Sequence, residues 1–176
     1  MKQKLHDIVG LTKIGYDYRY ILSTYVDTSY WIDSAKDYFQ GMYIENLTDF
    51  NYSRCFTIYI NISDINSKTG TKKFNEFIKE KLSLYRVQIQ ISAIAPYALY
   101  KFIKYEFKDD EVNMKESFIP FLEEHCYIEK IVTEFLNKSG LIILDKTLLS
   151  VEIPNISMEM RKSNVTIYHY LFEDEY

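Results

Sequence analysis

The fold of this chain is decided by residues 56–107, which read FTIYINISDINSKTGTKKFNEFIKEKLSLYRVQIQISAIAPYALYKFIKYEF. In 56–62 apolar and polar residues alternate, and this period of two predicts a strand with one buried face. Residues 72–85 place apolar side chains at helical spacing opposite lysines and glutamates, so we expect an amphipathic helix there. Alternation returns in 87–92, and 97–107 is rich in Tyr, Phe and Ile, which together predict a two-stranded hairpin.

Patterns on either side of this stretch predict further elements. The first 50 residues are expected to add a strand at 16–25 and a helix at 29–43. Downstream, residues 108–116 are charged and indicate a connection, and 117–139 carry an apolar stripe that predicts a long helix. Residues 164–172 alternate again and predict a last strand, which is bulky on both sides and therefore interior to the sheet.

From residue 56 onward the expected order is strand, helix, strand, strand, helix, strand. This is the order of the ferredoxin-like βαββαβ arrangement, so residues 56–172 are expected to form such a core with an N-terminal extension. The coarser expectation is an α+β fold, with a mainly antiparallel sheet and helices packed on one face. At 176 residues the chain fits one domain, which we assign to residues 1–176.

Composition and charge argue against several classes of protein. With 47% hydrophobic and 26% charged residues, the chain is expected to be globular rather than disordered. A net charge of −4 argues against nucleic acid as a partner, because neutralising phosphates needs a basic face. Apolar runs are too short for a membrane span and the first residues lack a signal-peptide pattern, so we expect a cytoplasmic protein without a membrane partner.

Histidine offers a starting point for acid–base or ligand chemistry. His169, between Tyr168 and Tyr170 in the predicted last strand, is the best candidate, because alternation could aim it at an acid on a neighbouring strand. This supports one interpretation of the chain, a small enzyme or ligand-binding protein with a pocket near His169. His125 and Cys126 look like a base and a nucleophile, but neighbours on a helix project about 100° apart and do not face each other.

Motifs of the common enzyme and metal-site classes are missing from the sequence. It contains no HExxH, GxSxG or glycine-rich fingerprint, and the adjacent acids Asp109, Asp110 and Glu111 lack the spacing of a calcium loop. Cys55 and Cys126 lack CxxC spacing and are expected to be small buried side chains, with a disulfide between them left open. We therefore predict no catalytic residues, no metal and no cofactor, and favour a non-catalytic protein.

Tyrosine and negative charge favour protein binding instead. The chain has 17 Tyr, and residues 89–176 hold 15 Asp and Glu against 9 Lys and Arg, whereas 1–88 hold 10 against 12. Interfaces use rigid aromatic anchors, together with charge that sets register and association rate. The candidate contact residues are acids and tyrosines of the C-terminal half: Glu123, Glu124, Tyr127, Tyr168, Tyr170, Glu173, Asp174 and Glu175.

The stretch 165–175, VTIYHYLFEDE, together with the size and acidity of the chain, resembles the immunity proteins of bacterial polymorphic and contact-dependent toxins. The resemblance lies in the character of the chain, so no family residues are carried over. It implies a stoichiometric inhibitor that binds a cognate protein and blocks its site, the toxin domain most often being a basic nuclease. A self-associating structural subunit is a third interpretation.

Overall fold

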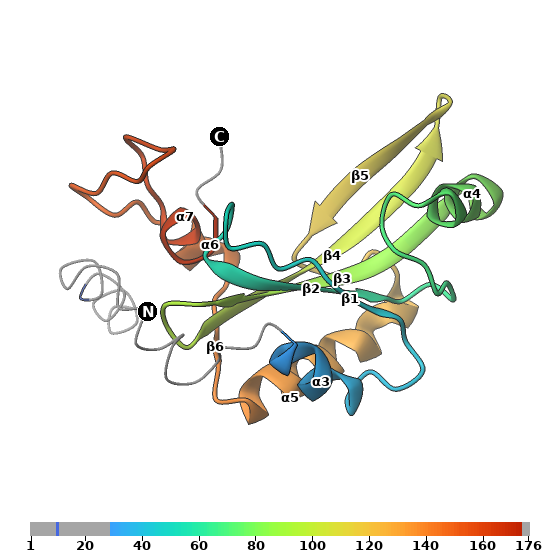
Figure 1. Ribbon diagram of the computed structural model, residues 1–176, viewed down its shortest axis with the longest axis horizontal. Helices are drawn as coiled ribbons and strands as arrows, with labels where there is room; N and C mark the ends of the chain where they lie inside the picture. Colours follow the sequence, from blue (N-terminus) through green and yellow to red (C-terminus); the bar gives the residue numbers. More distant parts are fainter. Residues whose placement is uncertain (1–9, 11–28, 174–176) are drawn as a thin grey trace.

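The computed structural model describes residue 10 and residues 29–173 (Figure 1). These residues form an α+β fold with a six-stranded, mostly antiparallel sheet of order β1-β2-β3-β4-β5, in which β6 pairs with β4 in parallel. The strands are β1 (Ile44–Asn46), β2 (Cys55–Asn61), β3 (Ser83–Ser92), β4 (Tyr97–Lys108), β5 (Glu111–Ser117) and β6 (Ile142–Ile143). The helices are α3 (Tyr30–Lys36), α4 (Lys72–Lys81), the 3-10 turn η1 (Glu123–His125), α5 (Cys126–Lys138), α6 (Lys146–Leu149) and α7 (Ile167–Leu171).

The central stretch folds as its periodicity predicts. β2, α4, β3 and β4 follow one another, and the three strands form an antiparallel meander in which Ile58 lies opposite Ile89, and Ile89 opposite Tyr100. Helix α4 is capped by Thr71, whose side chain accepts a hydrogen bond from the amide of Phe74. The predicted elements of residues 56–107 are therefore confirmed, with the helix ending at Lys81.

One face of the sheet packs against α3 and α5, which lie beneath it in Figure 1. Trp31 and Phe39, from α3 and the turn after it, meet Phe135 of α5 edge to face, with ring centroids 6.3 and 6.1 Å apart. All three side chains are buried. Aromatic pairs in this arrangement contribute about 0.5–1.5 kcal/mol beyond the area they bury, so this is a well-anchored face of the core.

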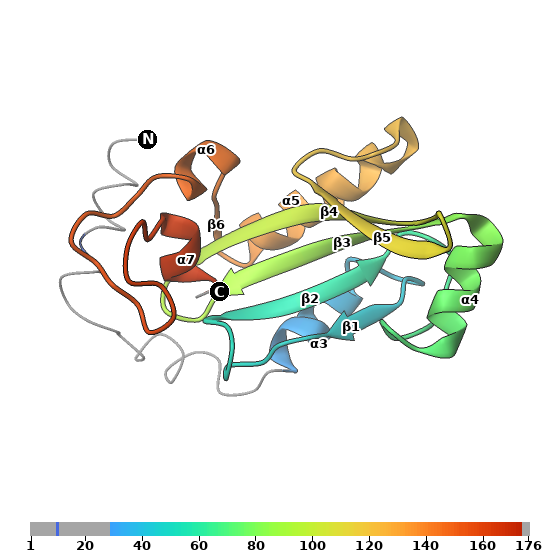
Figure 2. The same ribbon diagram turned by 90° about the horizontal axis from the view of Figure 1, so that it is seen from above.

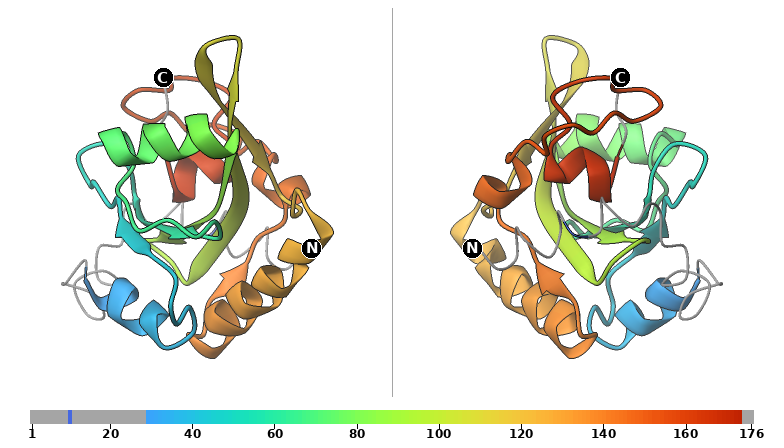
Figure 3. Two further views of the ribbon diagram at one scale, coloured as in Figure 1. Left: turned by 90° about the vertical axis from the view of Figure 1, so that its right-hand side faces the viewer. Right: turned by 90° about the vertical axis from the view of Figure 1, so that its left-hand side faces the viewer.

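The opposite face is also covered by helices, and this corrects the expectation that they pack on one face. Helix α4 covers one end, where Phe74 and Ile78 pack against Leu84 and Ile103 of the sheet. Helices α6 and α7 cover the other end, as the views in Figures 2 and 3 show. The reason is that β3 and β4 carry apolar residues on both faces, so each face must be shielded from water.

The ferredoxin-like order is not observed. β2 and β3 flank α4 but are adjacent and antiparallel, whereas a βαβ unit joins parallel strands. The predicted last strand, 164–172, is instead helix α7. Thr166 caps this helix by accepting a hydrogen bond from the amide of His169, while the His169 ring accepts one from the Thr166 amide. This capping box outweighs the alternating pattern on which the strand prediction rested.

The charged stretch 108–116 is also different from the expectation, because it forms a strand. Asp109 and Asp110 have φ of 54° and 64°, the left-handed pair typical of a type I′ turn, and they join β4 to β5 as a hairpin. The long helix predicted from residue 117 begins only at Cys126, because residues 118–122 run around the sheet edge with Pro120 among them.

The remaining predictions of local structure have mixed outcomes. The helix expected at 29–43 is shorter and ends at Lys36, and the strand expected at 16–25 lies outside the described residues. Gly140 follows α5 with φ of 73°, which is the left-handed conformation expected after a helix end. Cys55 is buried as predicted, whereas Cys126 is exposed because it sits on the outer side of α5, and both thiols are free.

Candidate functional site

Exposed apolar side chains gather on residues 119–127, which we call the edge segment. It runs from the end of β5 into α5, past the β5 edge of the sheet (Figure 2). Ile119 is 69% exposed, Tyr127 49% and Leu122 37%. Large apolar groups exposed so close together in the chain are typical of surfaces that contact another molecule.

The edge segment is held in place by the side chains that point inward. Phe121 and His125 pack on the ring of Tyr85 from β3, with ring centroids 6.4 and 4.9 Å away. Ile128, one turn further along α5, is fully buried. The inward residues thus hold the segment against the sheet, and Ile119, Leu122 and Tyr127 remain in solvent.

Negative charge accompanies these apolar groups. Glu123 and Glu124 are both exposed, and the edge segment contains no lysine or arginine. Burial lowers the pKa of His125, with nearby Glu124 acting in the opposite direction, so the imidazole is neutral at pH 7. The segment therefore presents two carboxylates beside its exposed side chains without a compensating cation of its own.

Tyr168, Tyr170 and Glu173, which were predicted as contact residues, make contacts within the molecule instead. The Tyr168 hydroxyl donates to Glu173 at 2.7 Å, and the Gln90 amide donates to the same carboxylate at 2.6 Å. The Lys101 ammonium lies 4.9 Å from the centroid of the Tyr168 ring. Tyr170 is buried in the apolar cluster under α7. These contacts join α7 and Glu173, two residues beyond its end, to the sheet.

The structure does not bring all the predicted contact residues onto one surface. Glu123, Glu124 and Tyr127 belong to η1 and α5, whereas Tyr168 and Tyr170 belong to α7, and α5 and α7 cover opposite faces of the sheet (Figure 1). Residues 174 and 175, predicted as the contact acids Asp174 and Glu175, lie outside the described part. Among the described members of the predicted set, exposed charge is found at Glu123 and Glu124, with the exposed Tyr127 close by in the sequence.

His169 has a local structural role. Its Nδ1 atom accepts a hydrogen bond from the Thr166 amide at 3.1 Å and lies 2.8 Å from the Thr166 hydroxyl, closing the cap of α7. Across residues 10 and 29–173, no group of three or more His, Cys, Asp or Glu side chains is arranged to hold a metal ion.

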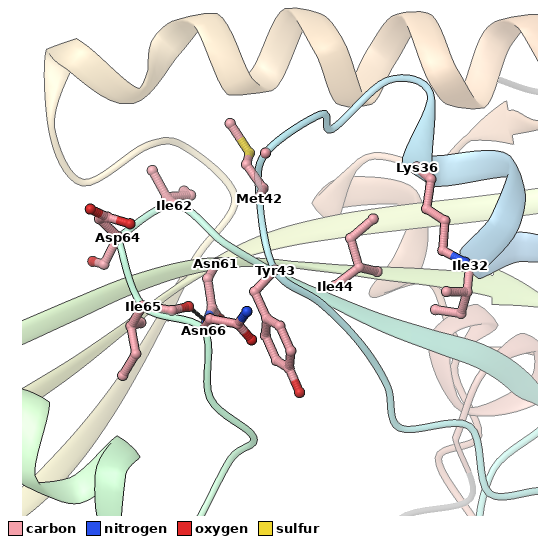
Figure 4. A pocket seen from close by; sticks show the side chains of 12 residues that line it. Ile32, Lys36, Met42, Tyr43, Ile44, Asn61, Ile62, Asp64, Ile65 and Asn66 are labelled. Atoms are coloured by element: carbon pink, nitrogen blue, oxygen red, sulfur yellow. Dashed lines mark hydrogen bonds between the residues drawn. The ribbon is translucent and has the colours of Figure 1, made fainter.

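A pocket of about 450 Å³ lies elsewhere, between α3 and the residues that follow β2 (Figure 4). Asn61 lines it, is 2% exposed and donates its side-chain amide to the Ile65 carbonyl at 2.6 Å. The Asn61 side-chain oxygen is buried without a hydrogen-bond partner. No sequence motif marked this pocket, because Asn61 fills an ordinary polar position of the β2 alternation.

A buried ion pair beside the pocket also escaped sequence reasoning. Arg86 of β3 is fully buried and donates to Glu45 of β1 at 2.7 Å and to the Thr69 hydroxyl. Its guanidinium lies over the Tyr59 ring, 4.6 Å from the centroid. Burial raises the pKa of Glu45, but hydrogen bonds from Thr69 and Arg86 outweigh this and hold the pKa below its usual value. The cluster connects the β2–α4 loop to the sheet.

Comparison of the chain with protein-family models, with curated proteins and with solved structures finds no match. Among the described helices, none has both the length and the apolar character that crossing a bilayer requires.

Proposed function

We propose that this protein is a non-catalytic binding module that contacts a partner protein through the edge segment. The observation that carries the proposal is the exposure of Ile119, Leu122 and Tyr127 on a segment that is anchored to the sheet. Two exposed carboxylates, those of Glu123 and Glu124, lie in the same segment, which contains no lysine or arginine. Interface hot spots combine exposed aromatic anchors with surrounding polar groups, and anchoring the segment beforehand lowers the entropy lost on binding.

The charge of the edge segment favours a basic partner. Glu123 and Glu124 attract positive charge, and no cation of the segment offsets them. Together with the resemblance of the chain to toxin immunity proteins, this supports a basic toxin domain as the cognate partner, neutralised by a stoichiometric complex in the cytoplasm. In this proposal Tyr127 enters a pocket of the partner, and the two acids set register and association rate.

The test measures binding between the purified chain and proteins encoded by neighbouring genes, by calorimetry. Tyr127→Ala is expected to weaken the complex at least tenfold, or about 1.4 kcal/mol, because it removes an exposed aromatic anchor. The double change Glu123→Lys and Glu124→Lys is expected to weaken the complex and to reduce the dependence of its affinity on salt.

Tyr52→Ala is the matched control, because Tyr52 is 73% exposed and lies outside the edge segment. Equal weakening by the Tyr52 and Tyr127 variants would contradict the proposed surface. So would a complex whose affinity survives the changes at both Tyr127 and the two acids.

Small-ligand binding is a second candidate, and the pocket beside Asn61 is the observation that favours it. The unpartnered side-chain oxygen of Asn61 could accept a hydrogen bond from a ligand that enters the pocket. This pocket is lined by residues between 32 and 66, so the candidate site differs from the one expected near His169. Crystals soaked with small hydrogen-bond donors would support this candidate if density appears beside Asn61.

A further inference from the structure

Strand β5 is the last strand at its end of the sheet order, and its outer edge is open to solvent. Residues 111–116 are all exposed, and Ser117 is half-buried. Within the described part of the chain, the β5 backbone makes no hydrogen bond outside its ladder with β4. Because ladder groups alternate in direction, part of its N–H and C=O groups point outward and are available to another strand.

The exposed apolar side chains of β5 lie on one face of the sheet, which they share with Glu116, whose carboxylate contacts Lys101 at 2.8 Å. Val112 and Met114, which are 39% and 53% exposed, lie opposite Phe107 and Tyr105 of β4 and extend the apolar face that α4 covers. Lys115 lies on the other face, where it contacts Glu106 at 2.7 Å. An open edge with exposed apolar groups and no proline is suited to pairing with a further strand.

The sequence of β5 is complementary to itself in one antiparallel register. If Asn113 lies opposite the Asn113 of a second copy, Glu111 lies opposite Lys115 and Val112 opposite Met114, each pair occurring twice by symmetry. The carboxylate of Glu111 has no ion pair within the described residues, so it is available for this contact.

The adjacent register, in which Met114 lies opposite itself, is less favourable. It places the carboxylate of Glu116 against Val112 and that of Glu111 against Ser117, so no oppositely charged residues meet. Among the residues of β5 itself, only the register centred on Asn113 therefore brings oppositely charged side chains together.

We propose that β5 is a homodimer interface, in which two copies pair antiparallel about a twofold axis at Asn113 and form one continuous sheet. The occupant of the edge is a second copy of this chain because both the charged and the apolar pairs are complementary within β5 itself. The proposed dimer contact involves no side chain of the edge segment, so a dimer can form whether or not a partner protein binds there.

Sedimentation velocity over a wide range of protein concentration tests the pairing. The unmodified chain is expected to show a concentration-dependent dimer, and Glu111→Lys to be monomeric because lysine then faces Lys115. Adding Lys115→Glu to Glu111→Lys swaps both charges and is expected to restore the dimer. An unmodified chain that stays monomeric throughout, or a double variant that remains as monomeric as Glu111→Lys alone, would overturn the proposal.

Oxidative cross-linking tests the register. In a Cys126→Ser background, Asn113→Cys is expected to form an intermolecular disulfide readily, because the two positions face each other across the axis. Glu111→Cys is the control, since its opposite residue is Lys115, and it should cross-link far more slowly. Equal cross-linking at both positions would refute the register, and circular dichroism confirms that each variant remains folded.

Discussion

Removing the charge of Glu45 is the sharpest test of how the sheet and the β2–α4 loop are held together. In Glu45→Gln the side chain keeps nearly the same shape, but the guanidinium of Arg86, which is fully buried, loses its only carboxylate contact in the described structure. Leaving one buried charge without its partner costs about 3–5 kcal/mol. Since a domain of this kind has about 5–15 kcal/mol of total stability, the variant should be markedly destabilised.

Urea denaturation followed by tryptophan fluorescence measures this loss. Trp31 is the single tryptophan of the chain and is 1% exposed, so its emission reports loss of the core. Glu76→Gln is the control, because the pair of Glu76 with Lys72 is solvent-exposed at 3.6 Å and such pairs contribute little. Changing Arg86→Met together with Glu45→Gln should cost less than the sum of the two single changes, because neither partner then remains charged.

The pH dependence provides a second measurement on the same pair. The folded state lowers the pKa of Glu45 below 4.5, so the stabilisation by its carboxylate is present above that pH and is lost as pH falls through the folded pKa. Unmodified protein should therefore lose stability in acid more steeply than Glu45→Gln. The reasoning is refuted if Glu45→Gln is no less stable than Glu76→Gln, or if both variants respond to acid as the unmodified protein does.

Two further changes test local features of the fold. Burial lowers the pKa of His125 below 6.5, so protonation favours the unfolded chain, and stability should fall as pH drops from 6.5 towards the folded pKa. In a plot of the urea midpoint against pH, His125→Asn should reduce the slope over this range. An unchanged slope would contradict the role given to His125. Leu82 has φ of 62° and is 61% exposed, so Leu82→Gly should relieve left-handed strain and raise stability by about 0.5–1 kcal/mol; a lower melting temperature would contradict this.

The candidate contact surface could be predicted in part from the sequence. Glu123, Glu124 and Tyr127 were expected at a surface, and they are exposed because Phe121 and His125 of the same segment occupy the inner side. Ile119 and Leu122 were not expected to take part, because an apolar residue in isolation predicts burial. Their exposure depends on the path of residues 118–122 around the sheet edge, which no local pattern determines.

The sequence by itself determined the centre of the fold. Residues 56–107 carry strong periods of two and 3.6, because each strand or helix there has a face that must be buried whatever its neighbours are. β3 and β4 are joined by a short connection, so their antiparallel pairing follows from nearby residues. The antiparallel pairing of β2 with β3 spans helix α4 and was decided by the tertiary structure, because the sequence pattern predicted a βαβ order there.

Only the tertiary structure decided the outer elements and the buried charges. Residues 164–172 alternate like a strand but form α7, because their apolar side chains find burial over β4 and the cap at Thr166 satisfies the first turn. β5 is a strand despite its charge because β4 offers it an open edge for pairing. Arg86 can be buried because Glu45 and Thr69, which are distant in the sequence, contact its guanidinium in the folded protein. Periodicity along the sequence does not predict contacts between such distant residues.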